Sequence, residues 1–185
     1  MPYQDVWVGG KLLQKGRREC AARYAAIREV CSGLDPCFSV LDIGANLCYF
    51  GIRITEDFPG AHVLALDHMR HDRTLARLRA SGADRVVLMR HKLTAKSARS
   101  IAAMMRFDVV LALSVLHHLS GSFEEWMAIL RRLGRNVVAE FAGEDSTAAQ
   151  LPEGYAVPHD AQLLAMIPSH LNPGVTRPLV LIPGE

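Results

Sequence analysis

Polar residues follow three short apolar runs in this chain, at the points where buried strands would end. They are Asp42 with Gly44, Asp67, and Ser114 with His117 and His118. The carboxyl ends of parallel strands form the edge at which α/β proteins bind ligands. A carboxylate at that edge can accept hydrogen bonds from ligand hydroxyls, and a neutral imidazole can accept a proton near pH 7. The sequence therefore predicts a ligand site with two acids and a candidate general base.

The first of these groups belongs to a stretch from Ser39 to Gly51 that predicts a buried strand, a tight turn and a helix. Gly44 allows a sharp turn, and Asn46 is predicted to cap the helix, where free backbone N–H groups attract electron-rich ligand atoms. A dinucleotide site would need glycines in the spacing Gly-x-Gly-x-x-Gly. Positions 44, 46 and 49 carry Gly, Asn and Tyr instead, so a different nucleotide ligand is favoured.

Asp67 closes the next apolar run, His62–Asp67, about 25 residues after Asp42. An acid at the end of the strand adjacent to the first can accept hydrogen bonds from both hydroxyls of a ribose. The alternative is that Asp67 only caps a helix. The third group lies in the exit of a strand at 107–113, and its histidines either act as a base or pack beneath a ligand.

These residues resemble the motifs of the class I S-adenosylmethionine-dependent methyltransferases over roughly residues 38–141. Asp42, Gly44 and Asn46 match the first motif, although Cys48 stands where many members carry another glycine. The resemblance implies that Asp67 binds the ribose and that His68 and Met69 lie beside the adenine. Lys92 replaces an aspartate that in many members holds the adenine amino group, which leaves that contact to backbone groups.

The resemblance thus implies S-adenosylmethionine as cofactor and a methyl transfer in which His117 or His118 is catalytic. The residues expected to bind the cofactor are Asp42, Gly44, Ala45, Asn46, Asp67, His68, Met69, Lys92, Leu93 and Ser114.

The elements that must position these residues alternate between strand and helix patterns, which predicts a single α/β domain over 1–185. We expect a Rossmann-like fold with a mainly parallel, doubly wound sheet. Its parts are an N-terminal arm and helix (1–37), a cofactor-binding core (38–141) and an abbreviated C-terminal segment (142–185). In that segment only 160–167 is predicted to be helical and 179–182 to be a strand, which Pro178 confines to a sheet edge or to a strand start.

Composition excludes several other classes of protein. No apolar run approaches the ~20 residues of a membrane span, and a signal pattern is missing from the first residues, so we expect a cytoplasmic protein. The four cysteines are too irregularly spaced for a metal site, and none is expected. A net charge of +2 gives no general attraction to nucleic acid.

Three function classes remain open. A small-molecule or natural-product methyltransferase is favoured by the His-His exit and the low net charge. An RNA- or protein-directed methyltransferase is suggested by arginines at 70, 73, 77 and 79 and by the basic residues at 15–18, which are more often simply solvated. A cofactor-binding module without transferase activity is suggested by Cys48 and Lys92.

Overall fold

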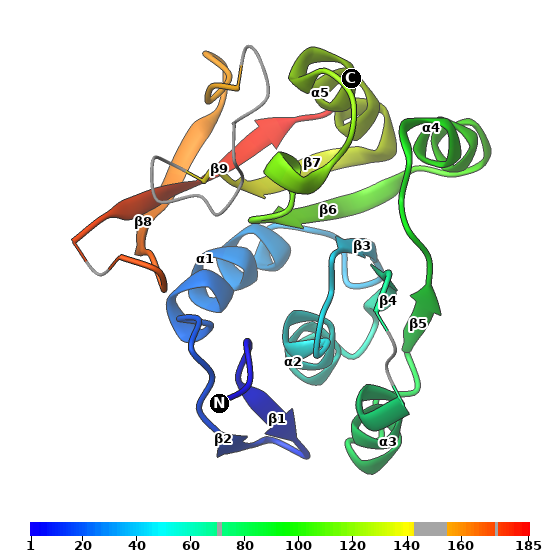
Figure 1. Cartoon of the computed structure of the whole chain (residues 1–185). Coiled ribbons are helices and arrows are strands. Elements are labelled where there is room, and N and C mark those ends of the chain that lie inside the picture. The colour runs from blue at the N-terminus through cyan, green and yellow to red at the C-terminus, as the bar shows by residue number, and fades with distance from the viewer. Residues whose placement is uncertain (70–71, 143–154, 173) are drawn as a thin grey trace. The chain divides into compact units, whose positions relative to one another are not determined.

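The computed structural model describes residues 1–69, 72–142, 155–172 and 174–185. Within these residues the chain forms two compact units, 1–92 and 93–185, which we describe in turn (Figure 1). The prediction of a single domain stays a prediction.

The first unit contains three parallel strands in the order β5-β4-β3. They are β3 (Ser39–Ile43), β4 (His62–Asp67) and β5 (Val86–Arg90). In the register Asp42 pairs with Ala65 and Ile43 with Leu66, so the ends of β3 and β4 reach the same edge. The sequence predicted β3 and β4 from their continuous apolar runs, which are typical of strands buried on both faces.

Three helices accompany these strands: α1 (Ala21–Ser32), α2 (Tyr49–Asp57) and α3 (Asp72–Ala80). The buried face of α1 holds Tyr24, Ile27 and Cys31, together with Cys20 just before the helix. In α3, Leu75 is 40% exposed. The buried face of α3 follows Thr74 and Leu78, which are four residues apart.

The N-terminal arm contains a small antiparallel hairpin of β1 (Val6–Val8) and β2 (Lys11–Gln14). Gly9 and Gly10 both have positive φ, as a tight hairpin turn requires. Side-chain oxygens of Glu56 in α2 accept hydrogen bonds from Trp7 Nε1 (2.6 Å) and Gly10 N (3.0 Å). The arm is therefore anchored to α2.

The second unit contains strands in the order β6-β7-β9-β8, of which β6 and β7 are parallel and the other pairs antiparallel. They are β6 (Phe107–Leu113), β7 (Gly134–Glu140), β8 (Gln162–Pro168) and β9 (Thr176–Pro183). Two helices, α4 (Ala95–Met104) and α5 (Phe123–Leu133), pack against each other. Thr94 caps α4 and Ser122 caps α5 through their hydroxyls.

The C-terminal segment corrects the sequence prediction. Residues 160–167, expected to be helical, include most of β8, which pairs with β9 along its length. The Leu, Gln, Ala and Met residues there favour a helix, but pairing with a neighbouring strand outweighs so weak a preference. Strand β9 is an interior strand, and Pro178 lies near its start, just before the first pair with β7, Glu140 with Leu179.

Within the described residues, no helix combines the length and apolar character needed to cross a membrane.

Candidate functional site

The turn after β3 has an unusual backbone. Gly44, Asn46 and Cys48 have φ angles of 73°, 51° and 58°, so three of five consecutive residues are left-handed. Glycine and asparagine tolerate this conformation, but Cys48 carries a strain cost of roughly 1–2 kcal/mol. The backbone N–H groups of Gly44 and Ala45 donate to Leu66 O at 2.8 and 3.1 Å, which attaches the turn to the end of β4. Strain of this kind concentrates at ligand sites.

The predicted capping role of Asn46 is wrong. Helix α2 starts at Tyr49, its N-cap position is Cys48, and no side chain at that position caps it. Cys48, two residues beyond Asn46, is again left-handed, which moves the helix start away from Asn46. Gln4 of the arm supplies the cap, since its Oε1 accepts from Leu47 N (3.1 Å) and Tyr49 N (3.4 Å). Asn46 Oδ1 is buried and has no hydrogen-bond partner within the described residues.

Asp67 joins the end of β4 to the turn after β3. Its Oδ2 accepts from Asn46 N at 2.8 Å and its Oδ1 accepts from Met69 N at 2.9 Å. Helix α3 begins only at Asp72, so Asp67 is not its N-cap. A carboxylate offers about four acceptor positions, so a side chain of this type can bind backbone N–H groups and ligand hydroxyls together.

Asp42 lies beside these residues at the end of β3 and is 2% exposed. Its Oδ2 has no hydrogen-bond partner in the part of the chain that the structure describes. Burial raises the pKa of Asp42 to about 7, the nearby Arg18 charge opposes this, and Asp67 adds to it. A buried carboxylate with an unmatched oxygen is expected to bind a donor from a ligand.

Arg18 was missed as a site residue. The sequence placed it in a basic group that is more often solvated, yet Arg18 is 2% exposed while its neighbour Arg17 is exposed. Its backbone N–H donates to Tyr3 O at 2.9 Å, and its guanidinium lies 5.5 Å from the centre of the Tyr3 ring. The only sequence signal was a cation at a helix start, where the helix dipole does not favour it.

The residues expected beside the adenine are on the surface. The His68 side chain is 66% exposed, with Nδ1 3.7 Å from Asp67 Oδ1, and Met69 is 55% exposed. Lys92 is exposed and Leu93 is half-buried. The preceding residue, His91, donates its backbone N–H to Asp67 O at 2.8 Å, which brings the exit of β5 next to the exit of β4.

In the second unit, Ser114 connects three elements. Its φ is 53°, its hydroxyl donates to Glu140 Oε1 at 2.7 Å, and it accepts from Arg177 Nη1 at 3.1 Å. Glu140 is fully buried and Arg177 is 2% exposed. This buried group fixes the exit of β6 relative to β7 and β9.

His117 and His118 follow in a short 3-10 helix, η1 (Leu116–His118). Their ring centres are 4.0 Å apart with planes tilted by 48°. Leu116 is buried, His117 is half-buried and His118 is exposed. The two imidazole rings are therefore in contact, and His118 is the more exposed of the two.

An aromatic cluster in the second unit was also missed. The rings of Phe123, Phe141 and Tyr155 lie within 5.1–5.8 Å of one another, and Tyr155 Oη accepts from Ala142 N at 2.8 Å. Burial is the main cause that raises the pKa of Tyr155 to about 12, so its phenol is neutral at pH 7. The acids that follow β7 in sequence, Glu144 and Asp145, lie outside the described residues, as does Arg70.

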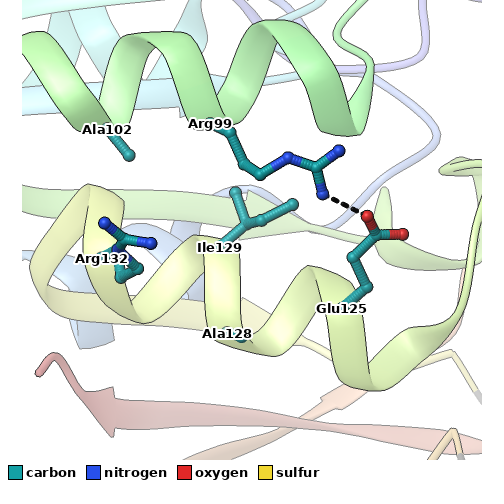
Figure 2. A pocket seen from close by; sticks show the side chains of 6 residues that line it. All are labelled: Arg99, Ala102, Glu125, Ala128, Ile129 and Arg132. Carbon is teal, nitrogen blue, oxygen red and sulfur yellow. Dashed lines mark hydrogen bonds and ion pairs between the residues drawn. The ribbon is translucent and has the colours of Figure 1, made fainter.

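The second unit also has a pocket, which lies between α4 and α5 (Figure 2). Its walls carry an ion pair between Arg99 and Glu125, and its floor includes Ile129. None of the predicted site residues lines this pocket. Within the described residues no group of three or more His, Cys, Asp or Glu side chains is arranged to hold a metal ion.

A family model described as a methyltransferase domain matches residues 41–139. This match covers more than half of the chain. The chain belongs to the methyltransferase-domain family. The predicted class I S-adenosylmethionine-dependent methyltransferase family and its Rossmann-like fold are thus confirmed, and S-adenosylmethionine is the cofactor of that family.

Solved methyltransferases share the fold. The bifunctional kinase-methyltransferase WbdD is 20% identical, with a TM-score of 0.75, and the match covers 91% of this chain and 40% of WbdD. The N-terminal domain of EvdMO1, determined with S-adenosylhomocysteine (SAH) and D-fucose, is 16% identical with a TM-score of 0.66, covering 98% and 90% of the two chains.

A third similar structure is magnesium protoporphyrin IX methyltransferase (ChlM) from Synechocystis PCC 6803 with bound S-adenosylmethionine. It is 16% identical with a TM-score of 0.59, and the match covers 89% of this chain and 78% of ChlM. The chain spans only 40% of the length of the WbdD structure. No curated protein sequence matches the chain.

Proposed function

We propose that this chain transfers the methyl group of S-adenosylmethionine to a small-molecule acceptor. The observation that carries this proposal is the strained turn after β3, which Asp67 holds by the backbone of Asn46 at 2.8 Å. Two buried oxygens at this turn, Asp42 Oδ2 and Asn46 Oδ1, have no hydrogen-bond partner in the described part of the chain. Such orphaned acceptors fit a ligand rich in N–H and O–H donors, as an adenosine with an amino-acid tail is.

The residues have separate roles in this proposal. Asp67 accepts hydrogen bonds from the ribose hydroxyls, and the backbone of Gly44, Ala45 and Asn46 approaches the cofactor closely, as a left-handed glycine turn allows. His68, Met69, Lys92 and Leu93 surround the adenine. Ser114 belongs to the cofactor-binding residues of the second unit. We place the protein in the cytoplasm as part of the same proposal.

The cofactor supplies an electrophilic methyl group on a sulfonium, and the protein mainly aligns the acceptor nucleophile with it. Where the acceptor carries a proton, His117 or His118 accepts that proton as a neutral imidazole. Transfer of the methyl group from the sulfonium sulfur to the nucleophile would leave SAH as the second product. The contact between the two imidazole rings, whose centres are 4.0 Å apart, supports placing both in the same role.

A small acceptor is favoured by what similar proteins bind. EvdMO1 was determined with D-fucose, and ChlM is a magnesium protoporphyrin IX methyltransferase. The arginines of α3 had suggested an RNA substrate. Arg73 and Arg79 are exposed, as on any solvated helix surface, and Arg70 lies outside the described residues, so they do not favour RNA. The RNA- or protein-directed enzyme and the inactive cofactor-binding module remain the alternatives.

The test is methyl transfer from labelled S-adenosylmethionine to a panel of sugars, porphyrin carboxylic acids, total RNA and a protein extract. We expect SAH to form with a small-molecule group, and His117→Asn to reduce that turnover by ~10² to 10⁴ without changing cofactor affinity. Transfer only to RNA or protein would refute the small acceptor. Tight cofactor binding with no transfer to any group would favour the binding module.

A further inference from the structure

Strand β8 is an edge strand that exposes apolar side chains. It pairs with β9 on one side, and among the described residues no strand pairs with its other side (Figure 1). Leu163 and Met166 in β8 are 57% and 51% exposed. Val157 and Leu171, in the segments that flank the strand, are 41% and 45% exposed. Large apolar side chains are therefore exposed both in this free strand and next to its two ends.

A β-bulge places Leu163 and Met166 on the same face of β8. Leu163 pairs with Val180 of β9 and Met166 pairs with Pro178, and the register shifts just after Leu163. Val180 and Pro178 are two residues apart, so they share a face of β9, and residues that pair across two strands also share a face. Ile167, on the opposite face, is only 1% exposed. The strand thus has one face with a buried residue and one face on which Leu163 and Met166 are exposed.

The edge formed by β8 carries no protecting charge. Natural proteins place charged residues on edge strands, because an unpaired strand otherwise pairs with another chain. No Asp, Glu, Lys or Arg occurs between Asp160 and Arg177. Strand β5, an edge strand in the first unit, also exposes Val87, but Arg85 precedes it and Arg90 ends it. The contrast indicates that β5 is protected from pairing, whereas β8 is suited to it.

A second copy of this chain fits the edge of β8. Two β8 strands can pair antiparallel about a twofold axis, which is the commonest symmetry of soluble oligomers. Leu163 of one copy then lies opposite Met166 of the other, and the symmetry repeats the contact. This pairing needs both residues on one face, which the bulge provides, since residues three apart in a regular strand point to opposite faces. An uncharged strand also brings no like charges together across the axis.

We propose that β8 is the interface of a homodimer, in which the β8 strands of two copies pair antiparallel and join their sheets. Leu163 and Met166 form the apolar centre of this interface, and the free backbone groups of β8 supply its hydrogen bonds. The inference goes beyond the proposed function and does not depend on which cofactor or acceptor the chain binds.

Sedimentation equilibrium of the wild-type chain and two variants tests the dimer. The wild-type chain is expected to be mainly dimeric at about 50 μM, since one strand and a few side chains make an interface of the small class. Leu163→Lys should raise the dissociation constant of the dimer about 100-fold, because the twofold symmetry introduces the charge twice. Val87→Lys is the matched control, at a residue of β5 that is 59% exposed, and should keep the wild-type dissociation constant.

Hydrogen exchange measured by NMR shows whether the backbone of β8 makes the contact. Ser169 N donates to Val175 O at 2.9 Å, and backbone groups alternate in direction along a strand, so those of Met166 point away from β9. At equal concentration, the Met166 amide should therefore exchange about 10-fold more slowly in the wild-type chain than in Leu163→Lys.

Circular dichroism establishes that each variant is folded, and Met166→Lys replaces Leu163→Lys if the latter unfolds. A wild-type chain that stays monomeric at this concentration would overturn the inference, whether a lipid surface, another protein or water then covers β8. A dimer that Leu163→Lys weakens no more than Val87→Lys does would also overturn it, as would a dimer in which the Met166 amide is not protected. Binding of SAH by the folded chain tests the proposed function separately in every case.

Discussion

Replacing Asp67 by asparagine tests whether one carboxylate holds both the turn and the ligand. The side chain keeps its shape but loses its charge, and its amide nitrogen must face one of the two backbone N–H groups now bound at 2.8 and 2.9 Å. From the sequence alone, Asp67 would act only on the ligand. The structure adds a second effect, because these two bonds join Asn46 and Met69 to the end of β4.

The size of both effects follows from the number of bonds lost. A hydrogen bond to a charged group contributes about 1.5–3 kcal/mol, and an N–H left unsatisfied costs a similar amount. With one of two such bonds lost at a side chain that is 6% exposed, we expect the free energy of unfolding to fall by about 1.5–3 kcal/mol. The affinity for SAH should fall about 10- to 100-fold, because the ribose hydroxyls then meet a neutral acceptor.

Urea unfolding without ligand gives the first number and isothermal titration calorimetry with SAH gives the second. Asp84→Asn, at an exposed acid before β5, is the matched control and should change neither. The free energy of unfolding of Asp67→Asn could lie within about 0.5 kcal/mol of the wild-type value and its affinity for SAH within twofold. Asp67 would then neither hold the turn nor bind the ribose, which would refute both roles.

Three further predictions concern stability. Burial raises the pKa of Asp42 to about 7, so the folded chain binds a proton at this carboxyl more tightly than the unfolded chain. The free energy of unfolding should therefore fall by up to about 4 kcal/mol as the pH rises from about 4 to 7. Asp42→Asn should remove this pH dependence from urea unfolding. An unchanged profile would mean that Asp42 is not the titrating group. Gly16→Ala would place a Cβ atom 2.3 Å from the backbone of Gln4, so it should lower the free energy of unfolding by about 1–3 kcal/mol and lower the melting temperature. Gly33→Ala is the control, because its Cβ atom would have its nearest contact at an ordinary 3.6 Å. Equal melting temperatures for the two variants would contradict the close packing of the arm. Ser114→Ala removes the hydrogen bonds to Glu140 and from Arg177, so the free energy of unfolding in urea should fall by about 1–3 kcal/mol. An unchanged free energy would show that Ser114, Glu140 and Arg177 do not hold the exit of β6.

The sequence was sufficient where local pattern decides structure. Strands β3, β4 and β6 follow from continuous apolar runs, and Asp67 was located because a strand-end acid has a position that topology fixes. The helix caps Thr94 and Ser122 depend only on residues three positions away, so local sequence is enough to explain them.

The sequence was insufficient where distant residues decide structure. Gln4 caps a helix that begins 45 residues later, and Arg18 becomes buried by contact with Tyr3; no local sequence pattern indicates either contact. Asn46 failed as a cap because Cys48, two residues later, is again left-handed, in a turn that β4 supports through hydrogen bonds from Gly44 and Ala45. Strand β8 was missed because its pairing with β9 overrides a helix-favouring composition.

The central claim is that this chain binds S-adenosylmethionine at the turn after β3. The most direct measurement is a crystal structure of the chain with SAH. We expect the ribose hydroxyls to lie within about 3 Å of the Asp67 carboxylate oxygens and the backbone of Gly44 and Ala45 to contact the cofactor. SAH bound elsewhere on the molecule, away from the Asp67 carboxylate, would contradict this claim.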